Sequence, residues 1–198
     1  MTTGDEVFQQ IQRLARSVAD KEGRPAPTAE YLTRHALESF LDRLSRTEHG
    51  DDFVLKGGIL LAVYGVRRPT KDVDAEAISA TVSADYIAEV VRGIAAVAID
   101  DGVCFDLDTM RVQEIREAAG YPGLRMRVDT YIGTHKAVVA WDISTGDPIV
   151  PLPKRVKVPR VLGGEIKMLG YAPGDRGRRE RCDHPGAWHH QHPLARLH

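Results

Sequence analysis

Apolar residues in the first third of the chain recur at the spacing of amphipathic helices. Over 5–22 and 28–46 they return every three or four positions, which is the period of a helix with one buried face. Gly23 ends the first segment, and Thr28 is the expected N-cap of the second. The stretch GGILLAVYG at 57–65 is apolar on every side, so we expect a short buried helix that starts at a glycine turn.

The remaining apolar residues more often alternate with polar ones, which is the spacing of strands. We expect a strand through Asp72–Glu76, a helix over 82–97, a strand near 103–109, an antiparallel pair at 125–132 and 136–144, and a hairpin that turns at Gly163–Gly164. Helices followed by a mixed or antiparallel sheet indicate the α+β fold class.

Composition narrows the class of protein without identifying it. A chain of 198 residues has room for one domain with a real core, with or without a small appendage. The net charge of −1 does not indicate a nucleic-acid binder, so only a local basic patch would serve that purpose. No apolar run approaches the roughly 18 residues that a membrane-spanning helix needs. The N-terminal residues show no cationic and then apolar signal sequence. The two cysteines do not form the paired pattern of a disulfide-bonded protein. We therefore expect a cytoplasmic protein with no membrane partner.

Three acidic residues alternate along the strand expected after the glycine-rich helix. Asp72, Asp74 and Glu76 would point to one face of that strand, where their charges repel one another. Carboxylates two positions apart suit a pair of Mg²⁺ ions, because hard divalent cations prefer oxygen ligands. Such a site usually takes a third carboxylate from a neighbouring strand. Asp142, a single acid directly after an apolar run, is the candidate.

The segment before these acids offers a site for phosphate. At Gly57 and Gly58 a helix begins with free backbone N–H groups, and its dipole favours an anion. Phosphates bound there and metals at the aspartates would position a nucleoside triphosphate for nucleotidyl transfer. Each feature also has an ordinary interpretation: a polar strand, a tight packing turn, or an aspartate that caps a turn. The order of the features along the chain favours the nucleotidyltransferase interpretation.

This order resembles the nucleotidyltransferases of the DNA polymerase β superfamily. The stretch FVLKGGILLAVYGVRRPTKDVDAEA, residues 53–77, is more closely similar to the signature of the AbiEii/MenT group of toxin nucleotidyltransferases. The preceding YLTRHALESFLDRLSRTEHGDD and the later WDISTGDPI are similar as well, so the resemblance covers about residues 28–173. It implies a polymerase-β-like catalytic core at 53–173, a mixed or antiparallel sheet with flanking helices, preceded by N-terminal helices at 1–52.

The resemblance implies the toxin of a bacterial type IV-like toxin–antitoxin pair. Such enzymes use Mg²⁺ and a nucleoside triphosphate, with CTP or UTP favoured, to add nucleotides to the 3′ acceptor end of tRNA. The modified tRNA is no longer aminoacylated, and translation stops. The expected partners are therefore tRNA and a cognate antitoxin protein.

The same resemblance assigns roles to individual residues. Asp72 and Asp74 would bind metal, and Asp142 would complete the triad, with a general-base role toward the attacking 3′-hydroxyl. Gly57 and Gly58 would cradle phosphates. The cations expected to offset the phosphate charge are Lys56, Arg67, Arg68 and Lys71. The alternative for each of these cations is a solvated side chain in a turn.

Thr70 lies two residues before the first metal ligand. In some members of the family, the hydroxyl residue at this position is phosphorylated under antitoxin control. The added negative charge beside the metal ligands would repel a triphosphate. The alternative is an ordinary turn residue after a proline.

The β-rich second half of the chain carries a basic strip. Its members are Lys154, Arg155, Lys157, Arg160 and Lys167. We expect the strip to contact tRNA phosphates. The alternation of these cations with valines fits the solvent-facing side of a strand equally well.

The chain departs from the family pattern after Pro173. Residues 174–198 show neither a helical nor a strand period and are rich in arginine, glycine, proline and histidine. One cysteine among clustered histidines lacks the paired spacing of a zinc site, so no structural zinc is expected. Read one base later with suitable codons, the stretch encodes ETVVAEKGVTILERGITSTRWRDY, an amphipathic helix followed by a turn. We therefore interpret 174–198 as a disordered, out-of-frame tail; the family's C-terminal helical lobe is then missing, and this exact chain is expected to be weakly active or inactive.

Two other classes of function stay open. A metal-dependent phosphodiesterase or nuclease would use the same three acids without a triphosphate. A degenerate transferase domain that only binds a partner would fit an altered C-terminal end. Dependence on a nucleotide separates the first class from a transferase, and inactivity of the protein with its frame restored would favour the second.

Overall fold

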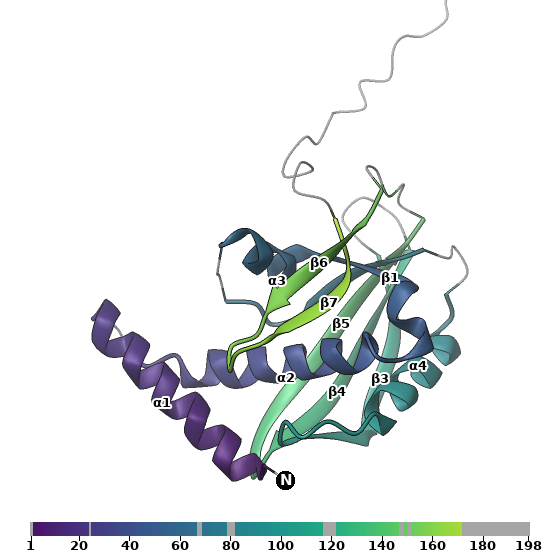
Figure 1. Cartoon of the computed structure of the whole chain (residues 1–198). Coiled ribbons are helices and arrows are strands. Elements are labelled where there is room, and N and C mark those ends of the chain that lie inside the picture. Colours follow the sequence, from purple (N-terminus) through teal and green to yellow (C-terminus); the bar gives the residue numbers. More distant parts are fainter. Residues whose placement is uncertain are drawn as a thin grey trace, which may run out of the picture.

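The computed structural model describes residues 2–23, 25–66, 69–78, 82–116, 122–146, 149 and 152–171. The helices of this part are α1 (Gly4–Glu22), α2 (Thr28–Leu44), α3 (Gly57–Leu61) and α4 (Ala84–Ala96), with 3₁₀ turns at Glu48–Asp51 and Ala62–Tyr64. The strands are β1 (Phe53–Lys56), β2 (Val73–Ala77), β3 (Val103–Arg116), β4 (Pro122–Ile132), β5 (His135–Thr145), β6 (Lys154–Pro159) and β7 (Glu165–Gly170). Figure 1 shows how these elements are arranged.

The expected helices are present, with differences at their ends. α1 begins at a capping box, in which the Thr3 hydroxyl accepts from the Glu6 N–H and the Glu6 carboxylate accepts from the Thr3 N–H. The prediction of Thr28 as the N-cap of α2 is wrong, because Pro27 occupies that position and Thr28 is already helical. A capping side chain needs the non-helical backbone that Pro27 adopts instead. α3 is shorter than its apolar stretch, which continues as a 3₁₀ turn and ends at Gly65 with a φ of 75°.

The strands form one mixed sheet in the order β3-β4-β5-β2-β1-β7-β6. β2 runs parallel to β5 and β1 runs parallel to β7, while the other neighbours are antiparallel. The expected antiparallel pair and the expected C-terminal hairpin are both present. β3 extends past residue 109 to Arg116, because its second half pairs with the start of β4 beyond a register shift. The α+β class with a mixed sheet is thus confirmed.

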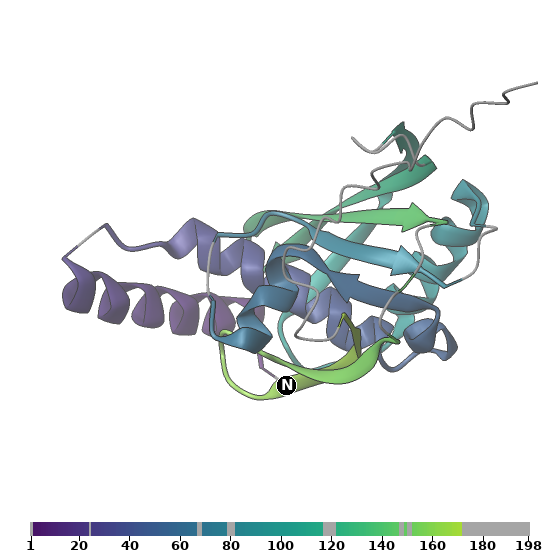
Figure 2. The ribbon, with the colours of Figure 1, turned by 90° about the horizontal axis from the view of Figure 1, so that it is seen from above.

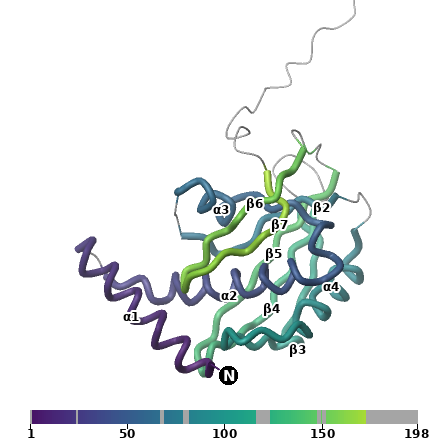
Figure 3. The backbone as a smooth tube through the Cα atoms, in the orientation of Figure 1, coloured from purple at the N-terminus to yellow at the C-terminus, as the bar shows by residue number. Residues whose placement is uncertain are grey.

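The sheet curls around α2, which forms the centre of the core. Figures 1 and 2 show α2 between the β6–β7 hairpin and strands β4 and β5, and the tube in Figure 3 follows the same path. Trp141 of β5 packs against Phe40 of α2 and Phe53 of β1, with ring centroids 5.3 and 4.6 Å apart, and all three side chains are fully buried. Large aromatic side chains dominate core energetics, so they fix this face of the sheet toward α2.

Buried ion pairs attach α2 to the segments around it. Arg43 donates to both carboxylate oxygens of Asp101, at 2.7 and 2.9 Å, and both side chains are buried. Burial alone would raise the pKa of Asp101, but hydrogen bonds from Arg43 and Ser39 hold that pKa below its ordinary value. In the turn between β6 and β7, Arg160 donates to Asp42 of α2 at 2.8 Å. These contacts fix the hairpin and the start of β3 to the central helix.

None of the described helices is both long and apolar enough to cross a membrane. Residues 174–198, with the Cys182 and histidine cluster considered for zinc, lie outside the described residues. The out-of-frame interpretation of this stretch therefore stays a prediction.

Candidate active site

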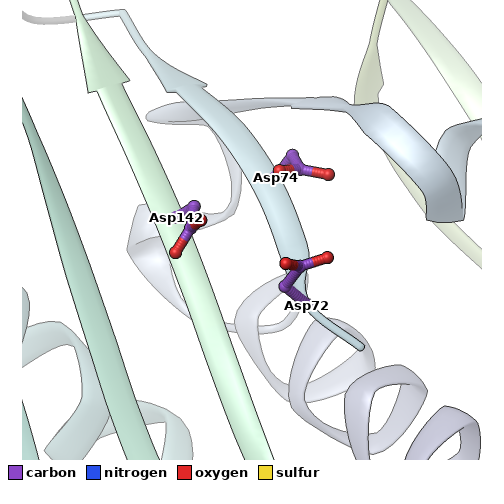
Figure 4. Close-up of side chains that lie close together, drawn as sticks. All are labelled: Asp72, Asp74 and Asp142. Carbon is purple, nitrogen blue, oxygen red and sulfur yellow. The ribbon is translucent and has the colours of Figure 1, made fainter. Parts of the chain in front are cut away.

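Three aspartates come together where two neighbouring strands run side by side. Asp72 lies directly before β2, Asp74 lies within β2, and Asp142 lies on β5. Each offers a carboxylate oxygen within 4.8 Å of those of the other two. Figure 4 shows the three side chains gathered over this pair of strands. The structure thus brings together the three residues that the sequence analysis placed in one site.

The register of the sheet explains why the aspartates meet. β2 and β5 are parallel, with Asp74 directly opposite Asp142. The residues on either side of these two are buried hydrophobic side chains: Val73, Ala75, Trp141 and Ile143. Successive side chains of a strand point to opposite faces of the sheet. Burial of the hydrophobic set against α2 therefore directs both aspartates to the outer face.

The glycine pair at the start of α3 lets the backbone approach Asp74. Gly57 has a positive φ of 66°, and a Cβ on it would lie 1.8 Å from Asp74 Oδ2, so only glycine fits. The Gly58 N–H donates to the Asp74 carboxylate, and a Cβ on Gly58 would lie 2.4 Å from Thr70 Oγ1. The expected phosphate cradle thus also supports an expected metal ligand. Phosphate binding at this turn stays a prediction.

The charges of the cluster make the ionised form of Asp74 costly. Its burial, with the charges of Asp72 and Asp142 nearby, raises the pKa of its carboxyl group, although the Gly58 N–H and Lys56 favour the charged form. A divalent cation among these oxygens would cancel the repulsion. Oxygen-only donors suit hard cations such as Mg²⁺ rather than softer metals. The residues present therefore fit a magnesium-type site.

An arginine that the sequence analysis missed holds the third carboxylate. Arg125 of β4 is opposite Asp142 and binds both of its oxygens, with Nε donating to Oδ1 at 2.7 Å and Nη2 donating to Oδ2. This pairing, with Asp72 and Asp74 beyond it, raises the pKa of Arg125. The sequence did contain a signal for this contact. Once Gly133 is taken as the turn between two antiparallel strands, counting outward from the turn places 125 opposite 142.

The residues of the site form one row across four neighbouring strands. Lys56 of β1 is opposite Asp74 of β2, and Asp74 is opposite Asp142 of β5. Asp142 is in turn opposite Arg125 of β4. Two anions in the centre of the row are thus flanked by one cation at each end, which offsets part of their mutual repulsion.

Glu76, the third acid of the alternating set, lies outside the cluster that the aspartates form. Its side chain is fully buried, and its Oε2 accepts from Lys56 Nζ at 3.2 Å. Lys56 also donates to the Ser144 hydroxyl. The structure therefore places the expected phosphate-binding lysine against a buried acid of the next strand, and contact of Lys56 with phosphate stays a prediction.

Only some of the other residues expected near the nucleotide lie within the part of the chain that the structure describes. Arg67 and Arg68 lie outside the described residues, and Lys71 is exposed next to Asp72 in the chain. Thr70 is only 8% exposed. Phosphorylation of Thr70 stays a prediction.

The basic strip expected to contact tRNA lies on the β6–β7 hairpin, at one end of the sheet. Its exposed members are Lys154, Arg155, Lys157 and Lys167. Two of them are already paired, Arg155 with Asp51 at 2.6 Å and Lys157 with Glu165 at 2.9 Å. Arg160 binds Asp42 of α2 instead and is mostly buried. Contact of the strip with RNA stays a prediction.

A family model described as nucleotidyl transferase AbiEii toxin, type IV TA system, matches residues 39–175, which is more than half of the chain. No match was found among the curated proteins. A Helicobacter pylori protein assigned as a nucleotidyltransferase is similar in structure, with a TM-score of 0.47 and 14% identity over 73% of this chain and 54% of its own. JHP933 from Helicobacter pylori is similar with a TM-score of 0.46 and 13% identity, over 73% of this chain and 52% of that one. The chain therefore spans about half the length of these solved proteins.

Proposed function

Since the chain belongs to the AbiEii family of nucleotidyltransferase toxins of type IV toxin–antitoxin systems, we propose that it transfers nucleotides from a nucleoside triphosphate to the 3′ acceptor end of tRNA. The observation that carries the proposal is the convergence of Asp72, Asp74 and Asp142 on the outer face of the sheet. The proposed cofactor is Mg²⁺, and CTP or UTP is the favoured nucleotide. The proposed partners are tRNA and a cognate antitoxin, in the cytoplasm.

The proposed reaction is a displacement at the α-phosphorus of the nucleotide. The RNA 3′-hydroxyl oxygen forms a bond to that phosphorus, the bond to the bridging oxygen of the β-phosphate breaks, and pyrophosphate leaves. Asp72, Asp74 and Asp142 would hold the metal, whose charge offsets that of the triphosphate. Asp142 is the proposed acceptor of the hydroxyl proton. Arg125 binds both oxygens of Asp142 in the structure, and Asp142 would act through the second lone pair that each oxygen keeps.

The triphosphate is proposed to lie along the turn that precedes the metal ligands. Gly57 would present its backbone N–H group to the triphosphate oxygens, as at other helix N-termini that follow glycine-rich turns. The Gly58 N–H donates to the Asp74 carboxylate in the structure, so it would have to leave Asp74 to do the same. The cations proposed to offset its charge are Lys56, Arg67, Arg68 and Lys71.

Thr70 is the proposed site through which an antitoxin acts. Its hydroxyl lies against the Cα of Gly58, inside the proposed phosphate cradle. A phosphate there would add about two negative charges where the triphosphate is expected. Nucleotide binding and phosphorylation of Thr70 would then exclude each other.

The test is transfer of an α-labelled nucleotide to tRNA. CTP, UTP, ATP and GTP are each incubated with tRNA and Mg²⁺, with this chain and with a protein whose frame is restored after Pro173. We expect label at the 3′ end from CTP or UTP with the restored protein, and weak or no label with the 198-residue chain. Asp72→Ala should abolish transfer, whereas Asp85→Ala, which removes an exposed acid at the start of α4, should retain it.

Three results would contradict the proposal. These are transfer by Asp72→Ala at the unmodified rate, shortened RNA in the absence of any triphosphate, and no label from either protein. The second result would indicate a nuclease that uses the same acids, and the third would favour a binding module.

A further inference from the structure

The face of the sheet that carries the aspartates continues beyond them as a basic surface. Arg111 of β3 is opposite Arg127 of β4, which is opposite Ala140 of β5. Arg127 is two residues from Arg125, so both point to the face on which Arg125 binds Asp142. Both Arg111 and Arg127 are exposed. The two arginines thus occupy the row next to that of Arg125 and Asp142, about 7 Å away by strand geometry.

This outer face is open, whereas the inner face of the same strands is closed by α2. On the inner face, the side chains of β4 and β5 are buried: Met126, Val128, Val139 and Trp141. On the outer face, the neighbours of the two arginines are exposed: Gln113, Lys136 and Val138. A ligand therefore has access to Arg111 and Arg127 from solvent.

The charges of the two arginines are not neutralised by a carboxylate in the part of the chain that the structure describes. Arg111 Nη1 donates only to the main-chain carbonyls of Asp108 and Met110, at 3.3 and 2.8 Å. These contacts hold the side chain in place without offsetting its charge. Arg127 forms no ion pair with any other residue that the structure describes. Both guanidinium groups therefore keep donors available for an anion.

Acidic residues limit this surface on the side away from the aspartates. Asp106 and Asp129 are opposite each other on the same face, and Lys136 pairs with Asp129 at 2.5 Å. The positive surface is thus short and begins next to the candidate active site. Its extent suits one or two phosphates rather than a long duplex.

We propose that Arg111 and Arg127 bind the phosphates of a single-stranded RNA end whose terminal nucleotide reaches the three aspartates; this rests on the proposed function. Charge complementarity selects the occupant, because arginine binds phosphate with two parallel hydrogen bonds. The basic strip of the β6–β7 hairpin is the competing surface. It lies at the opposite end of the strand order, and two of its cations are already paired.

The test is the binding of labelled tRNA to the full chain, without a triphosphate, at several salt concentrations. Arg111→Ala/Arg127→Ala should weaken binding by about 10-fold and reduce the slope of log K against log salt by roughly 1.4, since each single-strand phosphate contact contributes about 0.7. The matched control, Arg16→Ala/Lys21→Ala, removes two exposed cations of α1 and should change the affinity by less than about two-fold. Lys154→Ala/Lys157→Ala tests the competing strip and should weaken binding less than Arg111→Ala/Arg127→Ala does. Arg111→Lys/Arg127→Lys keeps the charges and should retain most of the slope.

Unchanged binding in Arg111→Ala/Arg127→Ala, or a larger loss in Lys154→Ala/Lys157→Ala, would overturn the proposed surface. Circular dichroism and melting temperature must match those of the unmodified chain. Where they do not, Arg127→Glu and Arg111→Lys/Arg127→Lys carry the test: the former must weaken binding, and the latter must retain most of the salt slope.

Binding and transfer are measured separately, so the two proposals can fail separately. Arginine-dependent RNA binding without any labelled product would contradict the proposed function and still support the surface. Labelled product, together with RNA binding that does not depend on either arginine, would support the proposed function and contradict the proposed surface. If the unmodified chain binds no RNA, the proposal that this surface binds RNA is wrong.

Discussion

At the scale of single residues, the site depends on how the charge of Asp142 is shared. Its side chain is 13% exposed, and both of its oxygens are held by Arg125. A metal ion needs at least one of those oxygens. Arg125 therefore orients Asp142 and at the same time competes with the metal for it.

Arg125→Gln should tighten the binding of Mn²⁺, a stand-in for Mg²⁺, by about 5-fold. The reason is that a charge-assisted hydrogen bond contributes roughly 1 kcal/mol or more, and its loss frees the Asp142 oxygens. Isothermal titration calorimetry measures the change. Arg127→Gln removes the same charge from the same face without touching Asp142, and should change the affinity by less than about two-fold. Equal effects of the two variants would show that net charge matters and the contact does not.

At the scale of elements, the turn between β1 and α3 decides where Asp74 lies. Gly57 and Gly65 both have positive φ, of 66° and 75°. A Cβ on Gly57 would meet Asp74 Oδ2, whereas a Cβ on Gly65 would meet nothing within 4 Å. The two positions therefore separate backbone strain from the contact with the metal ligand.

Gly65→Ala should lower the free energy of unfolding by about 1 kcal/mol, the cost of a left-handed backbone in alanine, and leave Mn²⁺ binding unchanged. Gly57→Ala carries the same strain and also displaces Asp74, so it should be more destabilising and abolish Mn²⁺ binding. Urea unfolding and calorimetry give the two readouts. Retained metal binding in Gly57→Ala would show that the close approach is not required.

The tie between α2 and the segment before β3 predicts a dependence of stability on pH. The pKa of Asp101 is lowered from 3.8 in the folded protein. A carboxyl group of this kind contributes stability at pH values above 3.8, and the contribution is lost as the pH falls through the lower folded pKa. Asp101→Asn leaves the buried Arg43 without its charged partner and should cost about 3 kcal/mol at neutral pH.

Urea unfolding of Asp101→Asn and of the unmodified chain, measured over a range of pH, checks this dependence of stability on pH. The difference in free energy of unfolding should stay constant near neutrality and shrink only below 3.8, the ordinary pKa of the group. The control is Asp108→Asn, at an exposed position of β3, whose free energy of unfolding should match that of the unmodified chain at every pH. A difference that is independent of pH down to the acid transition would mean that the ion pair is not its cause.

The elements and the three aspartates follow from sequence pattern, while the contacts between elements do not. Asp72 and Asp74 stand out because they alternate along one strand, and Asp142 stands out because it is a single acid directly after an apolar run. Lys56 was expected to bind phosphate. The local sequence pattern does not show that Glu76, its partner in the structure, is buried. The role of Arg160 likewise depends on α2, which lies far away in the chain. Local periodicity shows which face a side chain takes but not what it meets there.

At the scale of the whole molecule, the curled sheet keeps stability and chemistry on different faces. The inner face packs on α2, and the outer face carries the row of Lys56, Asp74, Asp142 and Arg125. A charge cluster placed on the core side would have cost far more free energy, because buried unpaired charges are strongly penalised. The outer face bears a smaller cost, which a bound cation would remove.

That cost predicts opposite effects of one substitution on stability and on metal binding. The raised pKa of Asp74 means that its ionised form destabilises the metal-free protein at neutral pH. Asp74→Asn should therefore raise the free energy of unfolding in EDTA by about 1 kcal/mol, which is the scale of like charges opposite each other in a sheet. The unmodified chain should gain about 1.4 kcal/mol from Mg²⁺ at ten times its dissociation constant, and the variant should gain nothing. Calorimetric melting with EDTA and with Mg²⁺ measures both, with Asp85→Asn as the exposed control. A variant that melts lower in EDTA would contradict the cost assigned to the ionised Asp74, and a variant that Mg²⁺ still stabilises would show that Asp74 is not a ligand of the metal.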